Sequence, residues 1–458
     1  MSDLQDLAAF FQQHYAVPVV ILDLETTGGD VFGDRITEMA FLHFHQGQIT
    51  AVQQLINPER EISPFITNLT GISNEMTDSA PTAAAFLPSV MHFLRGSLLI
   101  AHNSRFDYHF LLNECRRNGL MLGMPSLCSV QLSRKLYPEH HKHSLEAILQ
   151  RHNIDGGSRH RAMSDVLALA HYLQIALKQR GADLWRQQAR LLTQAWLPES
   201  VSGSLKASLV NIADAAGITI WRDHAGVVCD IKVHQYAYRE TVAHLHHLKR
   251  LGRLPESVEF VAAVGVLHAA MLRAQSLHKW GLKIEQSSTG RHSVYFDTDP
   301  QDGCLKARIR PLKSGFHAEP PRGLFLHPKG AKRALNDWAR EQSICPTQLG
   351  ISETLPKGVP CPVSVVSTCV PACQTQDHLA HNHCVQTNWR SLRSADWGKM
   401  ARVQITETDP ISGQSITLLC QNGMIRLPES PIWYTDSHVL GVLKDKFKHA
   451  KQDIQMIE

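Results

Sequence analysis

The stretch VVILDLETTGGD, residues 19–30, begins with four apolar residues and then places Asp23 and Glu25 one residue apart, before a Thr-Thr-Gly-Gly turn. Such an apolar run bounded by a turn predicts a buried strand. Side chains alternate between the two faces of a strand, so both carboxylates lie on the same face. Like charges held close in a poorly solvated place repel each other and raise a pKa. The pair therefore needs a function that offsets this cost.

The residues around this stretch predict an α/β layered domain that ends near residue 180. Three strand-like segments come first, and strand and helix patterns then alternate along the chain. The expected elements are strands at 17–25, 35–44, 48–57 and 97–102 and helices at 82–96, 104–119, 143–154 and 162–181.

Three further residues of the same domain carry functional chemistry. Asp107 follows a predicted strand by about one helical turn, and His160 precedes Asp165, which opens a predicted helix. Taken alone, an Asp at a helix start is most often a cap, and a lone His most often lies on the surface. With Asp23 and Glu25 they form a set of carboxylates suited to Mg²⁺ or Mn²⁺. Two such ions about 4 Å apart can clamp a phosphodiester, and a histidine can deprotonate the attacking water.

The motifs DLETTG (23–28), HNSRFD (102–107) and HRAMSD (160–165) closely resemble, in this order, the exonuclease motifs of the DnaQ-like DEDDh family of 3'-5' exonucleases. The resemblance covers residues 18 to about 180. It implies a ribonuclease H-like fold, two Mg²⁺ or Mn²⁺ ions and release of 5'-mononucleotides from a 3' end. The implied metal ligands are Asp23, Glu25, Asp107 and Asp165, and the implied general base is His160. The matching positions that would shape the pocket for the terminal nucleotide are Thr26, Thr27, His102, Asn103 and Phe106.

After this 1–180 exonuclease domain, the composition predicts a connector at 181–205, a small α/β domain at 206–290 and a Cys-rich α+β region at 291–458 that ends in β-hairpins. Residues 197–232 resemble the start of a GIY-YIG endonuclease domain of the UvrC and Cho type, which is often fused to DnaQ-like exonucleases.

The catalytic pattern of that endonuclease family is missing from this segment. Gly217-Ile218-Thr219 and Cys229-Asp230-Ile231-Lys232 replace both family tyrosines and the glycine. Arg273 and Glu285 stand where the family has a metal-binding Glu and an Asn, while Arg239 is a candidate match to the catalytic Arg. We therefore expect a degenerate, inactive module, and binding of DNA or of a partner by this module stays open.

Four cysteines within 29 residues, with spacing C-x15-C-x7-C-x3-C, are typical of a single zinc or iron-sulfur site: Cys345, Cys361, Cys369 and Cys373. The C-x7-C-x3-C portion resembles the cluster that follows the nuclease domain in UvrC-type proteins, which implies a 4Fe-4S cluster. Scattered buried thiols are the alternative. Zinc also stays open, because more candidate ligands follow at His378, His381, His383 and Cys384.

The whole chain has the composition of a globular protein with two to four domains. Its 458 residues are 43% hydrophobic and 19% charged, with a net charge of +4. The N-terminus has no signal-peptide pattern and no apolar run is long enough to cross a membrane, so we expect a cytoplasmic protein without a membrane partner. The densest basic run is a candidate DNA path: Lys306, Arg308, Arg310, Lys313, Arg322, Lys329, Lys332 and Arg333.

The sequence thus predicts a metal-dependent 3'-5' exonuclease acting on single-stranded or frayed 3' ends, with DNA favoured and RNA left open. A repair role, with repair proteins as partners, is the leading expectation. A proofreading subunit that binds DNA polymerase III and a DNA-binding scaffold with a vestigial nuclease are the alternatives.

Overall fold

The computed structural model describes residues 2–155, 161–198, 201–282, 288–352, 378–392 and 402–457. These form two compact units, each with its own sheets and cores. The first comprises Met1–Ala263 with Asp409–Gly413, and the second Val264–Thr408 with Gln414–Glu458.

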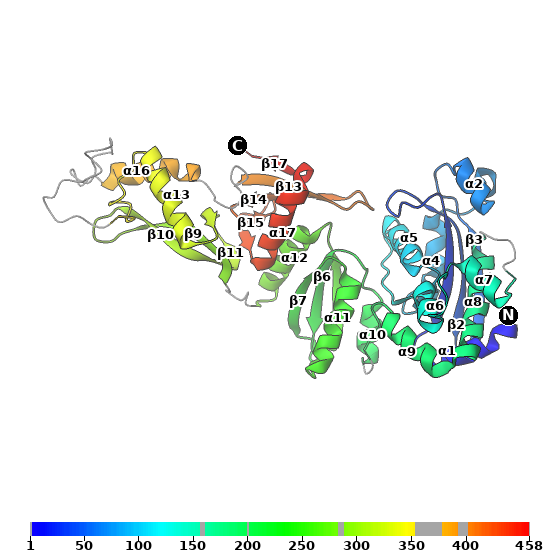
Figure 1. The fold of residues 1–458 in the computed structure, drawn as a ribbon. Coiled ribbons are helices and arrows are strands. Elements are labelled where there is room, and N and C mark those ends of the chain that lie inside the picture. The colour runs from blue at the N-terminus through cyan, green and yellow to red at the C-terminus, as the bar shows by residue number, and fades with distance from the viewer. Residues whose placement is uncertain are drawn as a thin grey trace. The chain divides into compact units, whose positions relative to one another are not determined.

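A five-stranded sheet, ordered β3-β2-β1-β4-β5, is the centre of the first unit (Figure 1). β1 pairs antiparallel with β2 and parallel with β4, and β4 pairs parallel with β5. The strands are β1 (Val19–Thr26), β2 (Ile36–His45), β3 (Gln48–Leu55), β4 (Leu98–Ala101) and β5 (Ser126–Cys128). The four predicted strands are confirmed, and β5 is additional.

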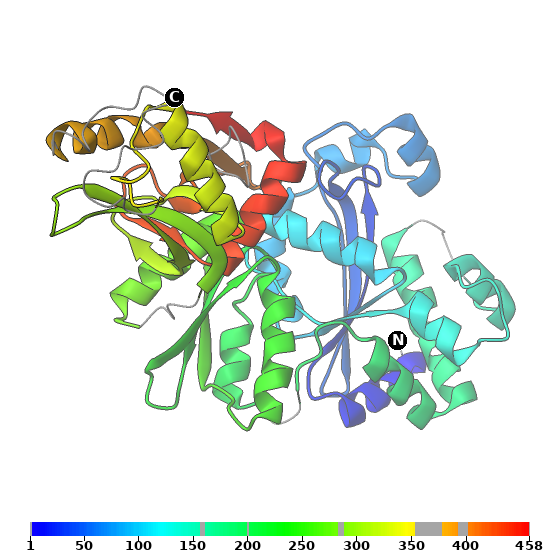
Figure 2. The same cartoon turned by 60° about the vertical axis from the view of Figure 1, so that its left-hand side comes forward.

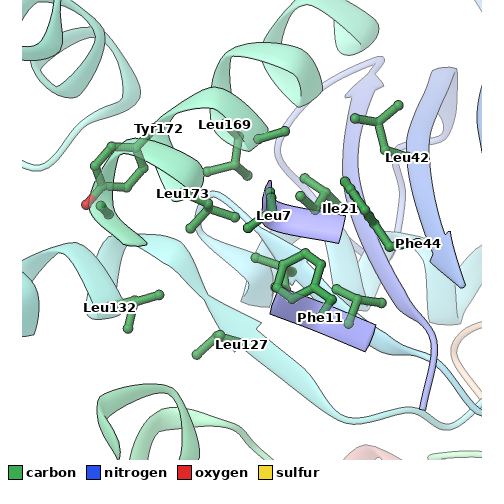
Figure 3. Close-up of a cluster of buried hydrophobic side chains, with 14 of the residues drawn as sticks. Leu7, Phe11, Ile21, Leu42, Phe44, Leu127, Leu132, Leu169, Tyr172 and Leu173 are labelled. Carbon is green, nitrogen blue, oxygen red and sulfur yellow. The ribbon is translucent and has the colours of Figure 1, made fainter. Parts of the chain in front are cut away.

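Helices cover both faces of this sheet because the strands are apolar on both sides. The first face packs against α1, α6, α8 and α9, and the second against α4 and α5. On the first face, Leu7 and Phe11 of α1 and Leu169 of α8 lie around Ile21 of β1 (Figure 3). The helices are α1 (Gln5–His14), α2 (Pro64–Thr70), α3 (Asn74–Asp78), α4 (Ala83–Leu94), α5 (Ser104–Arg117), α6 (Ser129–Leu136), α7 (Leu145–His152), α8 (Ala162–Arg180) and α9 (Ala182–Leu192).

The first unit continues beyond residue 200 with a small antiparallel sheet, ordered β7-β6-β8. Its core is formed by side chains of the sheet and of the helices α10 and α11. The elements are α10 (Gly203–Leu209), β6 (Gly217–Arg222), β7 (Val228–His234), α11 (Ala237–Arg250) and β8 (Ser257–Ala262).

The second unit contains two sheets. The sheet ordered β10-β9-β12 packs against α13, and a six-stranded sheet is ordered β11-β16-β15-β14-β13-β17 (Figure 2). The helices are α12 (Val266–Lys279), α13 (Pro328–Glu341), α16 (His378–Asn388) and α17 (Ser437–His449). The strands are β9 (Ser288–Thr298), β10 (Leu305–Lys313), β11 (Gly315–His317), β12 (Arg322–Phe325), β13 (Arg402–Thr408), β14 (Ser415–Gln421), β15 (Met424–Arg426), β16 (Trp433–Thr435) and β17 (Ile454–Met456).

The division into units falls inside the segment predicted to be one GIY-YIG-like domain. Strands β6 to β8 belong to the first unit and α12 to the second. The domain boundaries drawn from the sequence stay predictions. Among the described residues, no helix combines the length and apolar character that a membrane span requires.

Candidate active site

The alternation of β1 places two carboxylates on the face that α8 covers. Val19 and Ile21 are fully buried in the core shared with α8, whereas Val20 and Leu22 belong to the core on the opposite face. Asp23 and Glu25 continue the row of Val19 and Ile21, because side chains two residues apart share a face. The end of β1 therefore directs both carboxylates toward α8.

Asp165 completes a cluster with this pair. It lies in the first turn of α8, and one ligand oxygen each from Asp23, Glu25 and Asp165 lies within 4.8 Å of the others. This is the one group of three or more candidate metal ligands in the described part of the chain. Three hard oxygen donors at this spacing suit Mg²⁺ or Mn²⁺.

Asp107 lies on α5, the helix whose apolar side chains belong to the core on the second face of the sheet. It lies in the first turn of α5, which follows β4 through the left-handed residue Asn103, with φ of 72°. Its side chain is 2% exposed. Burial raises the pKa of Asp107 to about 8, while backbone hydrogen bonds at Asp107 itself and at Leu24 act in the opposite direction. Asp107 lies outside the 4.8 Å group, but its charge reaches Asp23.

The electrostatics of the cluster favour a bound cation. Burial, followed by the charges of Asp107, Asp165 and Glu25, raises the pKa of Asp23 well above its usual range. Burial raises the pKa of Glu25 to about 7, and the charges of Asp165 and Glu38 add to this shift. A divalent cation would stabilise the ionised carboxylates and offset the repulsion between them. The residues present therefore fit a metal site.

The predicted pocket residues lie next to this cluster in the chain. Thr26 and Thr27 are buried, and Thr27 Oγ1 donates to Asp34 Oδ1 at 2.9 Å. Asn103 is exposed and Phe106 half-buried.

His102 has one ring nitrogen that no described residue contacts through a hydrogen bond. Its Nδ1 lies 2.9 Å from Ser129 Oγ, while its Nε2 is buried and has no hydrogen-bond partner among the residues that the structure describes. Burial lowers the pKa of His102 to about 4, so the ring is neutral at pH 7. Unpaired buried polar atoms are rare, because each costs free energy.

Several predicted site residues fall outside the described part of the chain. They are His160, Glu285, Cys361, Cys369 and Cys373. Of the four-cysteine set only Cys345 is described, and it is buried. Among the neighbouring zinc candidates, His378 and His383 are exposed, whereas His381 is buried with Nε2 3.0 Å from the carbonyl oxygen of Leu305.

Two buried carboxylates near the site were not singled out from the sequence. Glu114 of α5 is held by Arg35, with Nη2 to Oε1 at 2.7 Å, and by Arg117 at 3.2 Å. Glu38 of β2 binds Arg161 at 2.8 Å. For Glu38, the available signal was a carboxylate directly before the run MAFLHF (39–44), because a charge inside a buried strand requires a partner.

The positions compared with GIY-YIG endonucleases carry other interactions. Thr219 is fully buried, with Oγ1 2.7 Å from His234 Nε2 and from Trp221 Nε1. Arg239 forms an ion pair with the buried Asp214. In the second unit, Arg273 Nη1 donates to Tyr434 Oη at 3.1 Å.

The predicted basic run divides into paired and exposed residues. Lys306 is paired with Asp302 at 2.7 Å, and the Arg322 guanidinium lies 4.5 Å from the centroid of the Trp389 ring. The exposed members are Arg308, Arg310, Lys313, Lys329, Lys332 and Arg333, of which Arg310 pairs with Asp297.

An α/β sheet whose central strand ends in a carboxylate cluster defines a candidate metal-dependent hydrolase. Residues 20–173 match the RNase_T family model, which is described as "Exonuclease". The chain therefore contains an exonuclease domain, and its N-terminal region has a ribonuclease H-like fold.

The chain is similar to parts of longer proteins. It is 28% identical over 261 residues to a DNA polymerase III PolC-type of Clostridium perfringens, covering 57% of this chain and 17% of that protein. It is 35% identical over 166 residues to the PolC-type polymerase of Latilactobacillus sakei, covering 36% of this chain and 11% of that protein. A Mycobacterium tuberculosis protein named as a bifunctional exonuclease/endonuclease is 28% identical over 264 residues, covering 55% of this chain and 40% of that protein.

Two solved structures are similar to part of the chain. Exonuclease X in complex with 5' overhanging duplex DNA covers 36% of this chain and 99% of its own, at 26% identity and a TM-score of 0.28. Escherichia coli Exonuclease I in complex with a dA16 oligonucleotide covers 37% of this chain and 42% of its own, at 18% identity and a TM-score of 0.33.

Proposed function

We propose that this protein is a metal-dependent 3'-5' exonuclease that releases 5'-mononucleotides from nucleic-acid ends. The observation that carries the proposal is the cluster of Asp23, Glu25 and Asp165 within a domain that matches an exonuclease family. With Asp107, these carboxylates would hold two Mg²⁺ or Mn²⁺ ions. Bound metal would neutralise the phosphodiester charge and lower the pKa of a water molecule. His160 would accept the proton of the attacking water.

The proposed substrate is a single-stranded or frayed 3' end, with DNA favoured. A paired terminal nucleotide must unstack before it can enter a pocket. Thr26, Thr27, Asn103 and Phe106 would shape this pocket. His102 would offer its Nε2 to the terminal nucleotide, which would supply the hydrogen bond that the described part of the chain leaves unmade.

A proofreading function is the second candidate, because several relatives carry the name DNA polymerase III PolC-type. Repair remains our preferred setting, since the chain continues for more than 250 residues after the exonuclease match. Stable co-purification with a replicative polymerase would reverse this preference. A vestigial nuclease acting as a scaffold is disfavoured by the intact acidic set.

We infer that the 206–290 segment is a degenerate GIY-YIG-like module without its own nuclease activity. The buried Thr219 and the ion-paired Arg239 support this inference, because neither group is free for catalysis. A D23A/D107A double variant should not nick circular duplex DNA. Metal-dependent nicking by that variant would contradict the inference.

The four cysteines, Cys345, Cys361, Cys369 and Cys373, are proposed to bind a 4Fe-4S cluster, with zinc as the alternative. Anaerobically purified protein should absorb near 400 nm (a characteristic iron-sulfur band) and should contain iron. A colourless protein that contains zinc would identify the alternative, and a metal-free protein would leave the cysteines as buried thiols.

Labelled oligonucleotides test the proposed activity, its polarity and its sugar preference together. With Mg²⁺ or Mn²⁺, 3'-labelled single strands should release labelled mononucleotide at once, and 5'-labelled strands should shorten in steps. Matched DNA and RNA strands decide the sugar preference. If the 5'-terminal nucleotide were released first, the proposed polarity would be refuted. If no nucleotide were released with either metal, the proposed activity would be refuted.

A further inference from the structure

Glu38 is a fully buried carboxylate that lies directly opposite Glu25 in the pairing of β1 and β2. Its oxygens accept hydrogen bonds from Arg161 Nε and Nη2 at 3.1 and 2.8 Å. The backbone N–H of Ala162 donates at 3.0 Å and Gln53 Nε2 at 2.9 Å. A carboxylate removed from water persists only when such donors satisfy it. The positions of these donors are therefore tied to Glu38.

These contacts lie at the point where α8 begins. Arg161 is the N-cap residue of α8, Ala162 is its first residue, and Asp165 follows within the first turn. The contacts of Glu38 join this turn to β2, the neighbour of β1. The direction of Asp165 toward Asp23 and Glu25 thus depends on an anchor that is not itself in the carboxylate cluster.

Glu38 also holds the positively charged guanidinium of Arg161 beside the cluster. The side chain of Arg161 is 32% exposed, and its guanidinium contacts both oxygens of Glu38. Its charge acts on Glu25 as well, since it opposes the rise that burial, Asp165 and Glu38 cause in the pKa of Glu25. A guanidinium released from Glu38 would be within reach of the same carboxylates that a metal ion needs.

We propose that Glu38 is a positioning residue of the metal site with two effects. It fixes the first turn of α8, so that Asp165 faces Asp23 and Glu25. It also retains the Arg161 guanidinium, which would otherwise compete with the metal ion for the cluster. This inference rests on the proposed function, because it concerns the same site.

Four variants test the inference: E38Q, R161K, E38Q/R161Q and the control Q174A. Mn²⁺ binding is measured by the electron paramagnetic resonance signal of free Mn²⁺, alongside nucleotide release across a range of Mn²⁺ concentrations. E38Q should bind Mn²⁺ about 10- to 100-fold more weakly, which is the usual effect of losing a residue that orients a metal ligand. R161K should weaken binding less, because lysine keeps the charge but not the forked geometry.

The double variant separates the two effects. If released Arg161 competes with the metal ion, E38Q/R161Q should bind Mn²⁺ more tightly than E38Q alone. A purely structural role predicts the opposite order, since the double variant has lost more contacts. Nucleotide release at saturating Mn²⁺ should recover more fully in the double variant than in E38Q.

Gln174 supplies the matched control on the same helix. It is nearly buried, accepts a hydrogen bond from the backbone N–H of Leu7 at 3.2 Å and donates to the carbonyl oxygen of Asp3 at 2.6 Å. Q174A should lower the melting temperature without changing Mn²⁺ binding.

The outcomes distinguish the inference from the proposed function. Wild-type Mn²⁺ binding in both E38Q and R161K would overturn the inference, and a double variant no better than E38Q would overturn its second effect. If E38Q does not fold, Mn²⁺ binding by R161K tests the inference instead, because the side chain of Arg161 is partly exposed. A wild-type protein that binds Mn²⁺ but releases no nucleotide would refute the proposed function alone, and one that binds no Mn²⁺ would refute both.

Discussion

Asp23 and Glu25 occupy positions that would otherwise extend the apolar row of Val19 and Ile21 into the core shared with α8. Their raised pKa values express the free energy that this burial costs the folded protein. Active sites commonly retain such locally unfavourable residues, because function requires them.

Removing one charge from the cluster should therefore stabilise the metal-free protein. We predict that D23N raises the free energy of unfolding in EDTA by about 0.5–2 kcal/mol while abolishing nucleotide release. Urea unfolding at pH 8 measures the first effect. A D23N protein less stable than the wild type in EDTA would show that the lost contacts of Asp23 outweigh the repulsion between the carboxylates.

The pKa values also predict how stability depends on pH. Glu25 and Asp107 have pKa values of about 7 and about 8 in the folded protein, against ordinary values near 4. Both groups hold their protons more tightly in the folded protein than in the unfolded chain. Their contribution to the free energy of unfolding is therefore complete below about pH 4 and is lost as the pH rises through about 7 to 8. Metal-free protein should lose stability across this window, and Mg²⁺ should raise the melting temperature more at pH 8 than at pH 6. Equal Mg²⁺ effects at both pH values would contradict this account.

The carboxylates of the proposed site could be predicted from the sequence, but the residues that position them could not. The motif spacing predicted Asp23, Glu25 and Asp165, and the structure brings these three together. Glu38 was missed because its partners, Arg161 and Ala162, lie more than 120 residues away. Such a contact depends on tertiary packing and leaves no local periodicity.

At the scale of elements, hydrogen bonds connect the segment that carries the small β7-β6-β8 sheet to helix α5 of the exonuclease domain. Tyr108, the neighbour of Asp107, donates its hydroxyl to Asp214 at 3.2 Å, and Asp214 also pairs with Arg239. The backbone N–H of Asp214 bonds the carbonyl oxygen of Leu122 at 3.0 Å. Arg239, the candidate match to the GIY-YIG catalytic Arg, thus forms a structural ion pair with Asp214.

Substitution of Asp214 tests this contact. D214N should lower the free energy of unfolding by about 1–3 kcal/mol, because it leaves buried groups imperfectly paired. Y108F removes one hydroxyl and should cost about 1 kcal/mol. Hydrogen exchange at the amides of α5 should increase in D214N. Unchanged exchange at the α5 amides would mean that the contact with Asp214 does not stabilise this helix.

Elements with a long periodic pattern were predicted well from the sequence. The strands β1 to β4 and the helices α5 and α8 match their expected segments within a few residues. β5 was missed because three residues are too few to display a period. The register that sets Asp23 opposite Ala40 likewise depends on packing.

At the scale of the whole molecule, the basic run outside the exonuclease domain stays a predicted surface for nucleic acid. Arg308 and Arg310 alternate along β10 and are both exposed. Residues 288–352 hold ten Lys and Arg against six Asp and Glu. The domain boundaries and the full cysteine set, by contrast, stay predictions from the sequence.

Charge reversal tests the basic surface. R308E/R310E should weaken binding to a long single strand and reduce the slope of log affinity against log salt by about 1.4, given about 0.7 for each phosphate contact. K444E/K448E makes the same charge change at exposed positions of α17 and should have a smaller effect. Equal effects of the two double variants would mean that net charge, and not this surface, governs binding.

The carboxylate cluster at the end of β1 is the proposed catalytic site. The most direct test is the rate of mononucleotide release from a 3'-labelled single strand by wild type and by D165N, at saturating Mg²⁺. We predict a loss of at least about a hundredfold in D165N, because the cluster would no longer stabilise the charge that develops in the reaction. A D165N protein that remains folded and releases nucleotides at the wild-type rate would contradict the account.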